Sequence, residues 1–259
     1  MGIIGAAFEN LLDVRTLGTA VLRRHLDRLL RRPLLRIPVR NIGTLHARRD
    51  DRSDWETIRY TFARNPFDTR FLPALDARLQ ARYEKILASR RVPVILDAGA
   101  NIGTTALWFA NRYPEARIAA VEPDPGNIAM LERNCAHEPR IVRIDAAIGS
   151  TPGCVALTGG AGWAVQSNRS EEGTSIVTVD AAVEAAGDEL FIAKINIEGF
   201  ERDLFATNLG WLSGVEAVMI EPHDWLEPGW HCTRTLQQAM AAQPFEMFIR
   251  EDFLIYARV

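Results

Sequence analysis

The fold of this chain is decided by the stretch Val94-Ile95-Leu96-Asp97-Ala98-Gly99-Ala100-Asn101-Ile102-Gly103. It begins with a short apolar run, which is typical of a strand buried in a parallel sheet. Asp97 ends that strand, and Gly99 and Gly103 turn the chain into a helix that we expect over 102–111. A strand, a glycine turn and a helix in this order predict the first unit of an open α/β sheet.

The alternation of apolar strands and helices continues to the end of the chain. It predicts an α/β fold with a doubly wound, mostly parallel, seven-stranded sheet. Only Arg250-Glu251-Asp252 separates the last two strands, so they are expected to form a C-terminal antiparallel hairpin. The expected strands cover 94–96, 116–121, 141–144, 191–197, 215–220, 245–249 and 253–257, with a short one at 176–179, and the later helices cover 125–135, 201–207 and 236–242.

Two parts of the chain are expected, an N-terminal helical extension over residues 1–90 and the α/β domain over residues 91–259. In the extension, leucines and valines recur at helical spacing over 8–32, and Pro33 ends that amphipathic helix. Ser53 or Asp54 would cap a second helix. A third helix is expected over 75–88.

Charge and cysteine content narrow the classes of partner and compartment. The net charge of -3 argues against nucleic acid as a partner, although ten arginines lie between Arg15 and Arg49. That run is interpreted either as a solvated helix face or as a weak peripheral contact for an anionic membrane. The three cysteines are scattered and odd in number, which favours free thiols in a reducing compartment and hence a cytoplasmic location.

The glycine turn also indicates what kind of ligand it binds. Its spacing, Gly99-x-x-x-Gly103, differs from the G-x-G-x-x-G pattern that seats a dinucleotide pyrophosphate. A carboxylate at Asp97 would repel pyrophosphate, but it suits the cationic amino-acid part of S-adenosylmethionine (SAM), directly or through water. We therefore predict that Asp97, Gly99, Asn101 and Gly103 bind SAM. A tight turn without a ligand is the alternative.

Two further strand ends extend the predicted cofactor site. The second strand of the domain ends at Glu122 and Pro123, and an acid at this place accepts hydrogen bonds from ribose hydroxyl groups. We assign both residues to the cofactor, whereas Asp124 fits the role of a helix cap. The third strand ends at Asp145 and Ala146, where the adenine is expected.

Several stretches in this order resemble the FkbM family of SAM-dependent methyltransferases, over about residues 45–258. They are Ser53-Asp54 ahead of an aromatic-rich helix, Ile95–Gly103, Ala120–Asp124, Lys194–Glu201, Ile220–Asp224 and Glu227-Pro228-Gly229. The resemblance implies a class I, Rossmann-like methyltransferase that uses SAM to O-methylate hydroxyl groups on sugars or other metabolites. One position departs from the family, which usually has Asp where this chain has Asn196. An amide cannot serve as a carboxylate base.

Catalysis is expected where the next two strands end, beside the methyl group. His223 is our first choice for the general base, because its unperturbed pKa of about 6.5 suits neutral pH. Glu198 is the second choice, and Asn196 lies on the same strand end. In the alternative interpretation, Asp224 satisfies His223 and Glu198 caps a helix. Lys194 either neutralises nearby acids or reaches solvent. No compact ligand motif indicates a metal, so none is expected.

Three functions are weighed at this point. The first is an O-methyltransferase with a glycan or a small molecule as acceptor. The second, suggested by Asn196, is a non-catalytic SAM-binding or scaffolding protein. The third, a nucleotide-dependent oxidoreductase, is disfavoured by the glycine spacing and the terminal hairpin. For the N-terminal helices, covering the acceptor pocket, forming a homodimer and touching a membrane all stay open.

Overall fold

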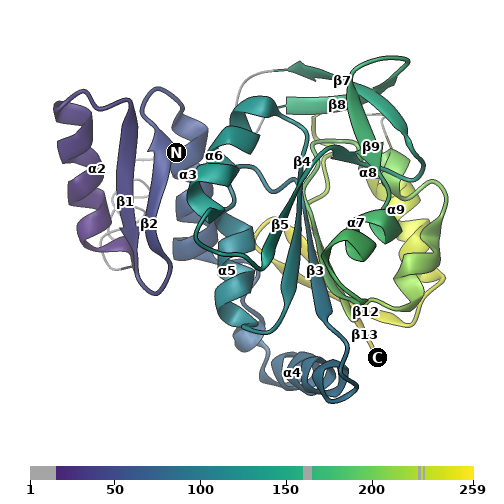
Figure 1. The fold of residues 1–259 in the computed structure, drawn as a ribbon. Helices are drawn as coiled ribbons and strands as arrows, with labels where there is room; N and C mark the ends of the chain where they lie inside the picture. The colour runs from purple at the N-terminus through teal and green to yellow at the C-terminus, as the bar shows by residue number, and fades with distance from the viewer. Residues whose placement is uncertain (1–15, 160–164, 227–228, 230) are drawn as a thin grey trace.

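A computed structural model describes residues 16–159, 165–226, 229 and 231–259. Within these residues, the centre is a seven-stranded sheet with the strand order β12-β13-β11-β10-β3-β4-β5 (Figure 1). Five neighbouring strands are parallel, and β13 runs antiparallel to both β11 and β12, which confirms the predicted sheet and hairpin. The strands are β3 (Pro93–Ala98), β4 (Arg117–Glu122), β5 (Ile141–Asp145), β10 (Glu189–Ile195), β11 (Ala217–Ile220), β12 (Phe245–Arg250) and β13 (Phe253–Arg258).

Alternate residues of the central strands face two separate apolar layers. Ile95 of β3 belongs to one layer, together with residues of α4, α5 and α6, whereas Val94 and Leu96 belong to the other, with residues of α7, α8 and α9. All of β3 is buried, which explains its continuous apolar run. The helices are α4 (Pro73–Ala88), α5 (Thr104–Arg112), α6 (Pro125–Cys135), α7 (Val179–Ala186), α8 (Glu201–Leu204), α9 (Cys232–Ala241) and the 3-10 helix Leu209–Ser213.

The strand order reverses between β3 and β10. From β3 the sheet continues to β4 and β5 on one side, and from β10 to β11 on the other. Such a switch point opens a crevice at the carboxyl ends of the strands, where open α/β sheets bind their ligands. Ala98 pairs with Ile195 across this point, so Gly99 and Asn196 leave the sheet side by side. The glycine turn is thereby placed against the end of β10.

The glycine-rich connection after β5 forms a second sheet, where we had expected only one short strand. In its described part, the strands β6 (Ala147–Ile148), β7 (Gly153–Gly159), β8 (Val165–Ser170) and β9 (Thr174–Val177) pair in the order β6-β9-β7-β8. Gly173 has a φ of +132°, and a Cβ atom there would come within 2.2 Å of the Val155 carbonyl oxygen. Strand β8 could not be predicted from the sequence, because its residues are mostly polar and do not alternate with apolar ones.

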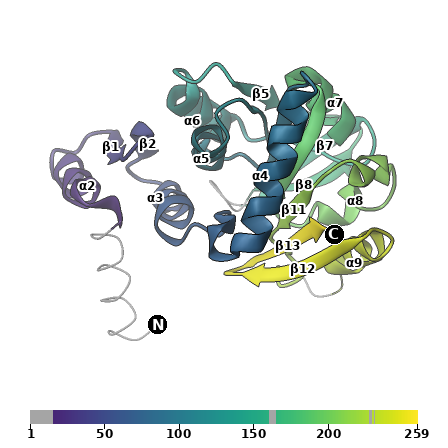
Figure 2. The same cartoon turned by 90° about the horizontal axis from the view of Figure 1, so that it is seen from below.

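The N-terminal extension contains a β-hairpin in addition to helices. Figure 2 shows α2 and this hairpin at one edge of the molecule. Leu35 and Ile37 are buried at alternate positions of β1, which a purely helical interpretation of the region misses. The elements are α2 (Thr19–Leu29), β1 (Leu34–Val39), β2 (Gly43–Arg48), α3 (Arg52–Arg59), the π-helix Tyr60–Arg64 and the 3-10 helix Thr69–Phe71. Residues 8–15 of the predicted first helix lie outside the described residues.

The cap of α3 differs from the prediction by a few residues. Asp51 is the N-cap, and its carboxylate accepts a hydrogen bond of 2.9 Å from the backbone N–H of Ser53. Asp54, which we had considered as the cap, is fully buried and binds the Arg48 guanidinium at 2.6 Å. This ion pair joins α3 to β2. No helix in the described ranges is long and apolar enough to span a bilayer.

Candidate functional site

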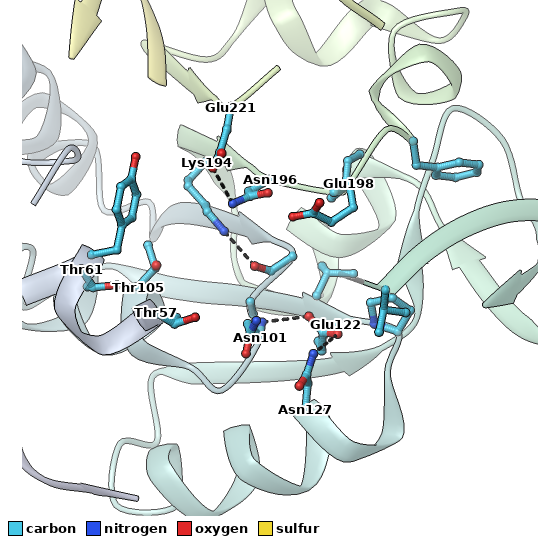
Figure 3. Close-up of a pocket in the computed structure, with 18 of the residues that line it drawn as sticks. Thr57, Thr61, Asn101, Thr105, Glu122, Asn127, Lys194, Asn196, Glu198 and Glu221 are labelled. Carbon is cyan, nitrogen blue, oxygen red and sulfur yellow. Dashed lines mark hydrogen bonds between the residues drawn. The ribbon is translucent and has the colours of Figure 1, made fainter. Parts of the chain in front are cut away.

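A cavity of about 500 Å³ lies at the switch point of the sheet. Residues at the carboxyl ends of β3, β4, β10 and β11 line it together with residues of α3 and the π-helix that follows (Figure 3). Among the predicted site residues, those that line the cavity are Gly99, Asn101, Glu122, Pro123, Ala146, Asn196 and Glu198. Those that are not among the lining residues are Asp97, Gly103, Asp145 and His223.

Gly99 lies in the cavity wall because two strand ends meet there. Its φ is +73°, and a Cβ atom would come within 1.8 Å of the backbone oxygen of Asn196. Only glycine allows this approach, which brings the turn after β3 against the turn after β10. Gly103 serves packing instead. It precedes α5, and a Cβ atom would come within 2.6 Å of the Cys135 sulfur, away from the cavity.

Asp97 is fully buried and pairs with Lys194, so its carboxylate does not lie in the cavity wall where the cofactor contact was predicted. Its carboxylate lies 3.0 Å from the Lys194 Nζ atom. Burial raises the pKa of Asp97, and the neighbouring ammonium opposes that rise. The same ammonium donates hydrogen bonds to the backbone oxygens of Gly99 (2.8 Å) and Ala98 (3.2 Å). The pair therefore holds the glycine turn in place. Of the two interpretations of Lys194, the structure agrees with neutralisation of a nearby acid and not with a side chain that reaches solvent.

Glu122 is fixed at the edge of the cavity by the N–H groups around it. One carboxylate oxygen accepts from the backbone N–H of Asn101 at 2.8 Å. The other accepts from the backbone N–H of Asp124 (3.1 Å) and from the Asn127 side chain (3.2 Å). Burial raises the pKa of Glu122, and these hydrogen bonds oppose the rise. Asp124 caps α6, as expected, by accepting from the Asn127 backbone at 2.8 Å.

The third strand end contributes only part of what we predicted. Ala146 lines the cavity, followed by Ala147 and Ile148. The Asp145 side chain is exposed, and its carboxylate lies 2.8 Å from the Arg143 Nε atom. The geometry therefore does not favour the assignment of Asp145 to the adenine, because the carboxylate is exposed beside an arginine and does not line the cavity.

Asn196 and Glu221 form a hydrogen-bonded pair in the cavity (Figure 3). The amide Nδ2 of Asn196 donates to Glu221 Oε2 at 2.9 Å. The amide Oδ1 is buried and has no hydrogen-bond partner among the described residues. Burial raises the pKa of Glu221 to about 7, although His223 lowers it; Glu198 and Asp252 raise it further. The pair offers a carboxyl group that changes charge near neutral pH.

His223 lies behind this pair, between two carboxylates. Its Nδ1 is 2.8 Å from Glu201 Oε1, and its Nε2 is 3.5 Å from Glu198 Oε1. Burial lowers the pKa of His223, but the hydrogen bonds to Glu198 and Glu201 outweigh it and raise the pKa to about 10. A histidine that is protonated at neutral pH has no lone pair to accept a proton. His223 is also not among the residues that line the cavity, so the geometry does not favour it as the general base.

The alternative for His223 also needs correction. Asp224 does not hold the imidazole. It accepts a hydrogen bond of 2.9 Å from the backbone N–H of Thr233. The partner of the imidazole is Glu201, which is buried at the start of α8. Glu198 has a left-handed backbone (φ 52°) and a side chain in the cavity wall, so it is placed by His223 rather than by a helix cap.

Three further lining residues were not predicted from the sequence. Tyr60 and Thr61 come from the π-helix, and Asp252 comes from the turn between β12 and β13. Burial raises the pKa of Tyr60, with Glu221 and Asp252 adding to the rise. None of them follows a parallel strand, which is the signal that located the other residues. The described residues contain no group of His, Cys, Asp or Glu side chains that could hold a metal ion.

Comparisons with known proteins give local and distant likenesses. No family model matches the chain. A stretch of 69 residues is 39% identical to a protein named methyltransferase sdnD from Sordaria araneosa. This stretch is 26% of the present chain and 27% of the relative, so only about a quarter of the relative's length is matched.

Two solved structures have similar chains. Methyltransferase FkbM from Methylobacillus flagellatus has a TM-score of 0.41 and 14% identity, over 64% of this chain and 43% of that one. The Podospora anserina methyltransferase PaMTH1, bound to S-adenosylhomocysteine, has a TM-score of 0.39 and 12% identity, over 79% of this chain and 85% of that one. None of these likenesses assigns the chain to a family.

Proposed function

We propose that this chain is a SAM-dependent methyltransferase that O-methylates a hydroxyl group of a glycan or small metabolite. The observation that carries the proposal is the cavity at the switch point, with the fixed Glu122 carboxylate at one place in its wall and the Asn196–Glu221 pair at another. The short match to a protein named a methyltransferase supports the same reaction class.

The residues of the cavity fit SAM. A carboxylate accepts about four hydrogen bonds, and protein groups supply three to Glu122, so one position is open to a ribose hydroxyl group. Pro123, Ala146 and Ile148 offer an apolar wall for the adenine. The turn at Gly99 and Asn101 borders the place for the amino-acid part. When bound, SAM supplies an electrophilic methyl group.

Glu221 is the group we assign as general base. Its carboxyl group lines the cavity, and its pKa of about 7 suits proton removal from a hydroxyl group near neutral pH. The Asn196 amide donates to one carboxylate oxygen, which orients the group and leaves the other oxygen for the acceptor. The amide at position 196 therefore does not remove the base from the site, because a carboxyl group stands next to it.

The acceptor would lie among Glu198, Glu221 and Asp252, beside Tyr60. Carboxylate oxygens accept hydrogen bonds from hydroxyl groups, and an aromatic ring offers a face for the apolar side of a sugar. His223 holds Glu198 in its position from behind. This arrangement supports a hydroxylated acceptor of small size.

The experiment that tests the proposal follows the methyl group. The full chain is incubated with SAM labelled in its methyl group and with separate panels of sugars, hydroxylated small metabolites and amines. We expect label in an ether linkage on a sugar or metabolite. Label on nitrogen alone would overturn O-methylation. SAM binding without transfer to any acceptor would favour a non-catalytic SAM-binding protein.

A further inference from the structure

Helix α2 presents a row of leucines to solvent. Leu22, Leu26, Leu29 and Leu30 are 71%, 46%, 80% and 54% exposed. Their spacing, at positions i, i+4, i+7 and i+8, places them on one side of the helix. The other side packs on the β1–β2 hairpin, with Ala20 fully buried. Helix α2 itself lies at the outer edge of the molecule in both views (Figures 1 and 2), and we call its four exposed leucines the leucine face.

A buried ion pair fixes which side of α2 faces outward. Asp27 is fully buried and accepts hydrogen bonds from the Arg36 backbone N–H (2.9 Å) and guanidinium (3.1 Å). Arg32 Nε lies 3.4 Å from the same carboxylate. Rotating the helix to bury the leucines would leave Asp27 without these partners, at the cost of an uncompensated buried charge. The leucine face is therefore a fixed feature of the surface.

The surroundings of the leucine face are strongly basic. Residues 19–40 contain seven arginines and one aspartate, a net charge of +6, whereas the whole chain carries -3. Arg28, Arg31 and Arg40 are exposed. Two copies of this chain would bring these like charges together if their leucine faces met, so charge complementarity favours an anionic partner over a second copy.

We propose that α2 docks on an anionic membrane surface. An amphipathic helix with leucines on one face and arginines at its edges lies in the plane of the interface, with its apolar side at the headgroup and acyl boundary. The leucines would enter that boundary, and the arginines would pair with lipid phosphates. The inference is independent of the methyl-transfer proposal, because no residue of α2 lines the cavity.

The test is co-sedimentation of the full chain with vesicles. We expect binding to phosphatidylcholine vesicles that contain about 30% phosphatidylglycerol, weak binding to phosphatidylcholine alone, and loss of binding at about 0.5 M salt. The double variant Leu22→Ser/Leu29→Ser should lower the partition coefficient at least about tenfold. The matched control is Met247→Ser/Ile249→Ser, which alters exposed apolar residues on β12 and should bind as the unaltered chain does.

A second pair of variants separates charge from apolar contact. Arg28→Gln/Arg40→Gln should lower the partition coefficient about fivefold per arginine, whereas the exposed Arg133→Gln should leave it unchanged. Circular dichroism checks that each variant is folded. Equal binding to both kinds of vesicle, or none to either, would overturn the proposal. The proposal would also be overturned if light scattering showed that the unaltered chain is a dimer, that the leucine variant is a monomer, and that neither binds vesicles.

Discussion

At the residue scale, the reactive end of the cavity depends on a carboxyl group that titrates near neutral pH. Glu221 has a pKa raised to about 7, chiefly by burial, and accepts a hydrogen bond from Asn196. As a base, it must be ionised before it removes a proton. The rate of methyl transfer should therefore rise as the pH rises through about 7 and level off above that value.

Replacing Glu221 tests its assignment as base. The Glu221→Gln variant should lose about 10²-fold or more in the rate of methyl transfer, because general-base catalysis contributes about 10²–10⁴-fold. Its affinity for SAM should stay within about twofold. The rise in rate around neutral pH should also disappear. Steady-state rates across pH check this, with the exposed Glu246→Gln as control. A variant rate equal to that of the unaltered chain would remove Glu221 from catalysis.

His223 makes a prediction about stability rather than catalysis. Its pKa in the folded chain is about 10, above the ordinary value of 6.5, so its proton stabilises the fold. That contribution is fully present below about pH 6.5 and is lost as the pH rises through about 10. We expect His223→Gln to cost about 3 kcal/mol near pH 6.5, with a gap that narrows at higher pH.

Urea unfolding of both chains at several pH values measures this gap. Both carboxylates that face His223, Glu198 and Glu201, remain in the variant. If the variant lost only packing contacts, the difference in unfolding free energy between the two chains would not change with pH. Such a constant gap would contradict the protonated state of His223. A narrowing gap would support its role in placing Glu198.

At the scale of elements, the glycine turn after β3 holds two strand ends together. Gly99 meets the Asn196 carbonyl so closely that a methyl group has no room. Gly99→Ala should therefore destabilise the fold by at least about 2 kcal/mol and weaken SAM binding. Gly210, in the 3-10 helix Leu209–Ser213, has open space around its Cα atom. Gly210→Ala is the matched control, with a change within about 0.5 kcal/mol.

Denaturant unfolding and SAM titration of both glycine variants give the comparison. Equal stability of the two variants would mean that the turn relaxes without loss.

Two other elements, the cap of α3 and the small sheet, were not predicted from the sequence. Asp51 is the cap, instead of Ser53 or Asp54, because its carboxylate accepts the hydrogen bond from the Ser53 backbone N–H. Strand β8 is polar and lacks the alternating apolar residues by which a strand is recognised in a sequence.

At the scale of the whole molecule, the sequence predicts the features that repeat along the chain. Apolar strands and the residues that follow them can be recognised in the sequence, so it predicts the sheet and places Gly99, Glu122 and Glu198 at the strand ends that line the cavity. Ion pairs and hydrogen bonds between residues that are distant in sequence could not be predicted in this way. Lys194 pairs with the buried Asp97, and the hydrogen bonds to Glu198 and Glu201 outweigh burial and raise the pKa of His223. The pattern of residues along the chain does not show which charged side chains will pair with one another in the fold.

The parts of the cavity that come from outside the sheet were also invisible in the sequence. Tyr60 lies on a π-helix of the N-terminal extension, yet it reaches the carboxyl ends of the strands. The extension thus has two parts: α3 and the π-helix border the cavity, whereas α2 lies at the outer edge of the molecule (Figure 2) and carries the exposed leucines. Of the open interpretations, covering the pocket fits the first part and membrane contact is our proposal for the second.

The most direct test of the central claim, that this cavity binds SAM through Glu122, is calorimetric titration with SAM and, separately, with NAD. We predict that the full chain binds SAM and does not bind NAD. Glu122→Gln should weaken SAM binding at least about tenfold, because a hydrogen bond to a charged group contributes about 1.5–3 kcal/mol. Tight NAD binding without SAM binding, or SAM binding that is unchanged in Glu122→Gln, would contradict the account.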